Sequence, residues 1–164
     1  MAVELSRRLA TENVPATGVE QVVEADAAEC LALARRMKLP EVRALWCRFR
    51  LVPLGAGVVR AEGWLRARAV RECVVSLELF EAETEEHFAV RFVPAGTESE
   101  NEDPDSEDEL AYAAGEIDLG EAAVEQFALA LDPWPRKPGA ALPAAAADPE
   151  EGPFAALARR NLPH

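Results

Sequence analysis

The feature that most restricts the fold of this chain is a pair of long alternating segments, residues 41–53 and 58–69, separated by a short glycine-rich stretch. Apolar and polar side chains alternate at every second residue, which indicates β-strands with one buried face. Glycines accept the positive φ angles of tight turns, so the stretch between the segments is typical of a hairpin loop. The sequence therefore predicts a long antiparallel β-hairpin.

The register of this hairpin follows from keeping both faces uniform. A two-residue turn would place Arg60 among the buried leucines, because a shift of one residue turns every side chain to the other face. A three-residue loop, Gly55-Ala56-Gly57, keeps apolar residues opposite apolar residues. The predicted pairs are Cys47 with Leu65, Arg48 with Trp64 and Trp46 with Arg66.

One face of the predicted hairpin gathers five arginines and two tryptophans. Guanidinium groups bind phosphates and indole rings stack on unpaired bases, so this combination is typical of a surface that binds single-stranded RNA. Cation–π pairing across the strands also explains why these residues are adjacent. The face could equally be a solvated sheet face, or one covered by the acidic segment, without binding a ligand. The candidate RNA-binding residues are Trp46, Arg48, Arg50, Arg60, Trp64, Arg66 and Arg68.

Charge is distributed very unevenly along the 164 residues. The chain has a formal net charge of −13, which opposes non-specific binding of nucleic acid because a uniformly acidic surface repels phosphate. Residues 41–72, however, hold seven arginines and three glutamates, whereas residues 73–125 hold 17 acidic side chains and one arginine. The basic hairpin therefore carries more information about function than the total charge does.

The remaining patterns predict a small α+β fold. Residues 19–24 and 84–94 alternate like strands. Asp26 followed by Glu29, and Asp118 followed by Glu121, are each typical of a capping box that begins a helix. We expect an antiparallel sheet of roughly four to six strands, with two main helices and a proline-rich C-terminal arm.

Composition suggests where the folded domain ends. Residues 1–135 are expected to form a single α+β domain. Residues 98–109 contain eight acidic side chains and one proline, so we expect a mobile acidic loop over about 95–110. Residues 136–152 are interpreted as a low-complexity linker, and residues 153–164 as a short C-terminal segment that docks through Phe154 and Leu157.

The acidic run and the proline-rich arm are also candidate partner-binding segments. The acidic side chains could simply keep the protein soluble, bind a basic partner, or shield the arginine face. The candidate partner-binding residues are Glu107, Asp108, Glu109, Trp134, Arg136 and Lys137.

Several function classes have no support in the sequence. We find no Ser-His-Asp set, H-E-x-x-H motif, Walker loop or G-x-G-x-x-G motif, and the carboxylates lie mainly in one flexible run. The three cysteines are typical of reduced thiols, and Cys73 with Ser76 has the C-x-x-C spacing but only one thiol. We therefore expect no enzymatic activity, cofactor or metal site, and, without a signal peptide or membrane span, a cytoplasmic location.

A set of ordered segments resembles the large ribosomal RNA subunit accumulation protein (YceD) family, in its alphaproteobacterial form. The segments are ADAAE (25–29), RARAVRECVVSLELFE (66–81), FAVRFVP (88–94), DPDSEDE (103–109), GEIDLGEAAVEQFALALDPWPRKPGA (115–140) and PFAALA (153–158). They cover nearly the whole chain, although none of them is a catalytic signature.

The resemblance implies a bacterial cytoplasmic protein that supports accumulation of 23S ribosomal RNA and biogenesis of the large ribosomal subunit. It implies no known catalytic residues. Relatives that resemble this chain carry C-x-R-C where this sequence has Cys73-Val-Val-Ser76, so one thiol is missing and Cys73 is expected to be structural. We expect a non-enzymatic factor that binds 23S rRNA or a large-subunit precursor, with an acidic chaperone-like module for a basic ribosomal protein as the alternative.

Overall fold

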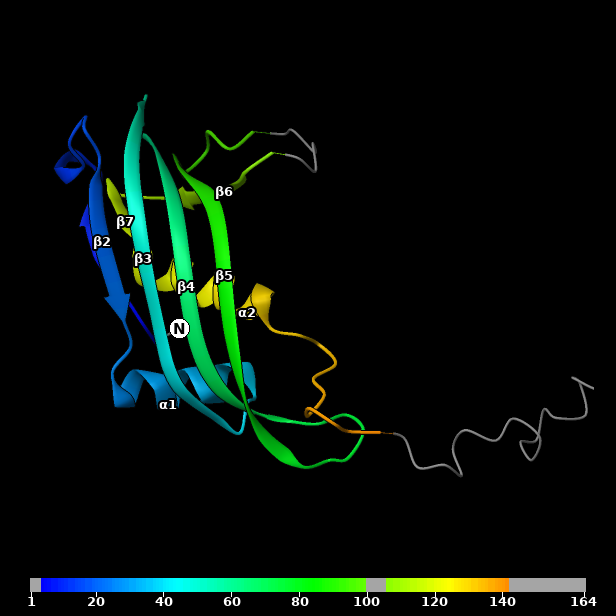
Figure 1. Cartoon of the computed structure of the whole chain (residues 1–164). Helices are drawn as coiled ribbons and strands as arrows, with labels where there is room; N and C mark the ends of the chain where they lie inside the picture. Colours follow the sequence, from blue (N-terminus) through cyan, green and yellow to red (C-terminus); the bar gives the residue numbers. More distant parts are fainter. Residues whose placement is uncertain (1–3, 100–105, 142–164) are drawn as a thin grey trace, which may run out of the picture.

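The computed structural model describes residues 4–99 and 106–141 and shows a twisted five-stranded sheet with both helices on one of its faces (Figure 1). The strand order is β2-β3-β4-β5-β6. The strands are β2 (Val19–Glu24), β3 (Glu41–Gly55), β4 (Val58–Glu72), β5 (Leu79–Pro94) and β6 (Asp108–Tyr112). The helices are α1 (Ala27–Met37) and α2 (Leu119–Ala130). The α+β class is confirmed.

The β3–β4 hairpin has the predicted register. Cys47 pairs with Leu65, Arg48 with Trp64 and Trp46 with Arg66. The loop is tighter than expected: Gly55 still pairs with Val58, and a β-bulge between Pro53 and Gly55 takes up the odd residue. Ala56 and Gly57 both have positive φ angles, 52° and 79°, which explains why the turn needs glycine beside a small residue.

The core lies between the sheet and the helices. The inward-facing side chains of β3 and β4 are buried, as the alternation predicts. Phe49 on β3 and Phe127 on α2 are both fully buried in the core between the sheet and the helices. Asp26 and Glu29 form the predicted capping box of α1. At α2 only half of the predicted box exists, because Asp118 caps the helix while the Glu121 carboxylate binds Arg36 instead.

The sheet is mixed, which corrects the prediction of a purely antiparallel sheet. Strand β6 lies parallel to β5, with Val90 opposite Asp108 and Phe92 opposite Leu110. Residues 108–110 therefore belong to a strand, although we expected the acidic loop to extend over about 95–110. Leu110 packs against the core and the neighbouring carboxylates contact arginines, so pairing with β5 outweighs the poor strand preference of acidic residues.

Two short strands form a second sheet that the sequence did not predict. Strand β1 (Arg8–Ala10) pairs with β7 (Glu116–Asp118), and a short 3-10 helix (Thr11–Asn13) follows β1. Arg7 beside this sheet donates two hydrogen bonds to the Glu29 carboxylate, at 2.8 and 2.9 Å. The N-terminal segment is thereby attached to α1, and the backbone N–H of Leu119, the first residue of α2, donates to the carbonyl of Arg7 at 3.0 Å.

After α2 the chain returns to the turn between β4 and β5. The backbone N–H of Val74 donates to the carbonyl of Pro135 at 2.9 Å, and Lys137 forms an ion pair with Glu78 at 3.1 Å. Residues 136–141, the beginning of the expected linker, therefore lie beside the domain. The rest of that linker and the expected docking segment 153–164 lie outside the described residues.

Candidate nucleic-acid interface

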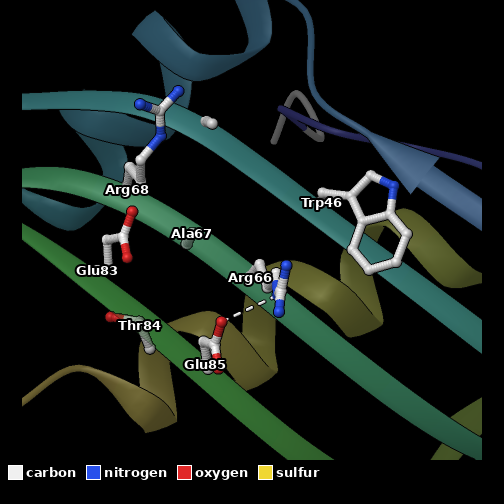
Figure 2. Close-up of a pocket in the computed structure, with 8 residues that line it drawn as sticks. Trp46, Arg66, Ala67, Arg68, Glu83, Thr84 and Glu85 are labelled. Carbon is white, nitrogen blue, oxygen red and sulfur yellow. Dashed lines mark ion pairs between the residues drawn. The ribbon is translucent and has the colours of Figure 1, made fainter.

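All seven candidate RNA-binding residues lie on the face of the sheet that the helices leave uncovered. Their neighbours in sequence, at alternate positions of β3 and β4, are buried in the core on the other face. Figure 2 shows Trp46, Arg66 and Arg68 projecting from the strands on the side away from the helices. The predicted segregation of arginines and tryptophans onto one face is confirmed.

Trp64 is the centre of a row of flat groups that crosses three strands. The Arg48 guanidinium carbon lies 4.8 Å from the centre of the indole ring, and the His87 ring stacks on it at 5.0 Å with an interplanar angle of 22°. The row follows from the register, because Trp64 is paired with Arg48 on β3 and with His87 on β5. Trp64 therefore already has two stacking partners within the protein.

Three of the five arginines are paired with the protein's own carboxylates. Arg60 lies between Glu62 and Glu107, with nitrogen–oxygen distances of 2.6 Å to each. Arg66 binds Glu85 at 2.9 Å, and Arg68 lies 3.9 Å from Glu81. The alternative in which the protein's own carboxylates shield the arginine face therefore holds for these three arginines. Arg66 and Arg68 meet glutamates of β5, whereas the partners of Arg60 lie on β4 and just before β6.

The remaining positive charge lies on β3. Within the described part of the chain, Arg48 and Arg50 form no ion pair, and both are exposed. Trp46 is half-buried and has no aromatic or cation–π partner among the described side chains. Apart from Glu62, which lies opposite Arg50, the centre of this face on β3 and β4 is therefore basic and aromatic, and its margins on β2 and β5 are acidic. The marginal carboxylates belong to Glu20, Glu24, Glu81, Glu83 and Glu85.

A shallow hollow of about 260 Å³ opens beside Trp46. Ala44 lies in the row next to Trp46, and its small side chain leaves the space that a larger residue would fill. Figure 2 shows the side chains that surround the hollow, which come from three adjacent strands. They include Trp46, Arg66, Arg68, Glu83 and Glu85.

The candidate partner-binding residues do not form one site. Glu107 binds Arg60, while Glu109 binds Arg91 at 3.5 Å and accepts from the Ser99 backbone at 2.7 Å. The acidic residues at β6 therefore do shield part of the arginine face, and Asp108 beside them is exposed. Trp134, Arg136 and Lys137 lie apart from them, beside the β4–β5 turn, where the Trp134 side chain is 71% exposed.

Cys73 lies in the turn between β4 and β5 and is fully buried, as expected for a cysteine with a structural role. Its sulfur accepts a hydrogen bond from the Ser76 backbone N–H at 3.5 Å. The Ser76 side chain and the backbone N–H groups of Lys137, Ser76 and Val75 lower the pKa of Cys73 to about 7, because they stabilise the thiolate. Burial raises the pKa of Cys47, on β3, to about 12.

Replacing Ser76 by Ala should raise the pKa of Cys73 back toward its ordinary value, since the Ser76 side chain is the largest of the contributions that stabilise the thiolate. Thiolate ultraviolet absorbance in a Cys30→Ala, Cys47→Ala background reports this titration without interference from the other two thiols. An unchanged titration midpoint would show that the backbone donors alone stabilise the thiolate.

Two further observations concern the described residues alone. No group of three or more histidine, cysteine or acidic residues is arranged to hold a metal ion within residues 4–99 and 106–141. Neither of the helices described there is long and apolar enough to cross a membrane.

The fold defines an α+β protein in which the two described helices lie on one face of a mixed sheet and leave the other face free of helices. A sequence model described as "Large ribosomal RNA subunit accumulation protein YceD" matches residues 61–158, more than half of the chain. The chain therefore belongs to the YceD family, which links it to ribosome biogenesis and accumulation of 23S rRNA. The match begins within β4 and includes β5, so Arg60 and the candidate residues of β3 (Trp46, Arg48 and Arg50) lie outside it.

Comparison with curated proteins gives no match, and comparison with solved structures gives none either.

Proposed function

We propose that the protein supports 23S rRNA accumulation by binding single-stranded rRNA on large-subunit precursors, in the cytoplasm and without catalysing a reaction. The observation that carries this proposal is the centre of the sheet face without helices, where Trp46 lies beside Arg48 and Arg50. Neither arginine forms an ion pair with a described carboxylate, although Arg50 lies opposite Glu20 and Glu62 in the sheet. A sheet that offers aromatic rings on an open face is one of the common ways in which proteins bind unpaired bases.

The two kinds of side chain have separate roles in this proposal. Trp46 supplies the stacking surface, because both neighbours of the Trp64 indole are already groups of the protein itself. Arg48 and Arg50 bind phosphates, and the acidic margins restrict the strand to the central part of the face. The same margins oppose indiscriminate binding of nucleic acid, consistent with the net charge of −13.

Two substitutions separate stacking from charge. Trp46→Ala should weaken binding of a fluorescently labelled, unstructured RNA about tenfold, since one base loses its stacking partner. Arg50→Gln should lower the slope of log affinity against log salt concentration by about one, as expected when one phosphate contact is lost. Fluorescence anisotropy measures both quantities.

Arg35→Gln provides the matched control for this measurement. Arg35 is exposed on α1, on the helix-covered side of the sheet, and its substitution removes the same charge. It should leave both the affinity and the salt slope unchanged. Equal effects of Arg35→Gln and Arg50→Gln would mean that RNA responds to total charge rather than to the uncovered face.

A second candidate function is that of an acidic module that binds a basic ribosomal protein. The specific observation in its favour is the row of glutamates on β5, of which Glu83 has no ion pair among the described side chains. Isolation of the protein from cells with and without ribonuclease distinguishes the two. Loss of ribosomal components after ribonuclease supports RNA binding, whereas retention of one small basic protein supports the acidic module.

A further inference from the structure

The hollow beside Trp46 combines three kinds of chemical group within one small space. Its walls carry an indole ring from β3, guanidinium groups from β4 and carboxylates from β5. With a volume of about 260 Å³ it is slightly smaller than typical small-molecule pockets, which suits one flat group rather than a whole cofactor. In Figure 2 Arg68 and Glu83 lie on one side of this space, and Arg66 with its partner Glu85 lies on the other side, next to Trp46.

The hollow is lined by the carboxylates of Glu83 and Glu85, and among the described side chains only Glu85 already has an arginine partner. Arg66 holds the Glu85 carboxylate at 2.9 Å. Glu83 is paired with Arg68 across the strands, but it accepts no hydrogen bond and forms no ion pair with any residue that the structure describes. Its side chain is exposed, so both carboxylate oxygens can accept hydrogen bonds from a ligand.

We propose that this hollow binds one unpaired guanine of the RNA, a proposal that rests on the proposed function. The Trp46 indole stacks on the base, and the Glu83 carboxylate accepts hydrogen bonds from the guanine N1–H and N2–H groups. The Arg68 guanidinium, whose nearest carboxylate is 3.9 Å away, binds a phosphate of the same strand.

Donor and acceptor patterns single out guanine among the four bases. Only guanine presents two adjacent N–H donors on its Watson–Crick edge, which matches the two oxygens of one carboxylate. Adenine and cytosine place an acceptor beside their amino group, and uracil places its single N–H between two acceptors. Each of these acceptors would face a carboxylate oxygen, and such contacts are repulsive.

Charge complementarity also favours a nucleotide over a basic peptide in this hollow. An arginine side chain could stack on Trp46 and bind Glu83, but it would enter beside the guanidinium groups of Arg66 and Arg68. A nucleotide instead offers a neutral base with donors to the carboxylate and an anionic phosphate to the guanidinium. Both signs of charge in the hollow are then matched by one ligand.

The test uses three labelled oligouridines that are identical except for the central nucleoside, which is guanosine, adenosine or inosine. Wild-type protein should bind the guanosine RNA about tenfold more tightly than the adenosine RNA, as expected for one bidentate contact. Inosine lacks the N2 amino group and should bind with intermediate affinity. Glu83→Gln should remove the preference for guanosine, and any gain in affinity from the loss of one negative charge should be the same for plain oligouridine and for all three RNAs.

Glu86→Gln is the matched control, since Glu86 lies three residues away on β5 and pairs with Leu65, whose side chain points into the core. It should retain the full preference for guanosine. Equal binding of all three RNAs, or a preference that survives Glu83→Gln, would overturn the guanine site and leave RNA binding intact. Failure to bind any RNA would overturn the proposed function and the guanine site together.

Discussion

Replacement of Asp118 by Ala should lower the free energy of unfolding by about 3 kcal/mol. The carboxylate accepts hydrogen bonds from the Ser6 hydroxyl at 2.5 Å and from the Arg7 backbone N–H at 2.8 Å. It also caps α2 through the N–H groups of Gly120 and Glu121, at 3.0 and 3.2 Å. The substitution therefore removes a helix cap and two of the hydrogen bonds that hold the N-terminal segment in place. Urea unfolding followed by circular dichroism measures the loss.

Glu116→Ala is the control for this effect. Glu116 lies on the same short strand, but its contact with Arg8 is 3.7 Å long and both side chains are largely exposed. Exposed pairs of this kind contribute about 0–1 kcal/mol, so the unfolding midpoint should barely move. A similarly small loss for Asp118→Ala would show that the N-terminal segment contributes little to stability.

The dependence on pH gives a second measurement on Asp118. Burial raises the pKa of Asp118, but the hydrogen bonds from Ser6, Arg7, Glu121 and Gly120 together outweigh burial and hold it below the ordinary value of 3.8. A carboxyl whose folded pKa lies below its unfolded pKa contributes stability above the unfolded value. The difference in stability between wild type and Asp118→Asn should therefore be constant above pH 3.8 and shrink as pH falls below it.

Gly63→Val should also destabilise the fold by about 3 kcal/mol, for a different reason. A Cβ atom at Gly63 would lie 2.1 Å from the Cζ atom of Phe88, because the ring tip rests directly on the glycine. Phe88 in turn packs edge-on against Phe49, with ring centres 5.8 Å apart. A side chain at Gly63 must displace the Phe88 ring and disrupt this buried aromatic pair.

A double-mutant cycle tests this explanation. In a Phe88→Ala background the space above Gly63 is empty, so Gly63→Val should cost much less there than in the wild-type protein. Urea unfolding of the four proteins gives the coupling energy, which should be about 2 kcal/mol. Additive losses would mean that Gly63→Val acts on the backbone of β4 and not through the Phe88 ring.

The sequence predicted the central hairpin well because local constraints define it. Alternation over residues 41–53 and 58–69 fixes the faces, and the glycines at 55 and 57 fix where the chain reverses. The helix starts at Asp26 and Asp118 were likewise visible as short-range capping patterns. Strands β1, β6 and β7 were missed because they are three to five residues long and, in β6, rich in charge.

The candidate site was predicted only as far as a single hairpin can define it. The register of β3 and β4 brought Trp46, Arg48 and Trp64 onto one face. The sequence did not show which strand lies on the far side of β4, so the pairing of Arg66 with Glu85 and the stacking of His87 on Trp64 went unforeseen. Whether a guanidinium is neutralised is therefore a property of tertiary neighbours, not of composition.

The pairing of β1 with β7 means that the second sheet forms late during synthesis of the chain. Strands β2 to β5 follow one another as neighbours, so each can add to the sheet as it emerges during synthesis. Residues 8–10, in contrast, pair with residues 116–118 and must wait until that distant segment has been made. The first strand in the chain is thus among the last to find its partner, and a nascent protein exposes it throughout the translation of the intervening sheet.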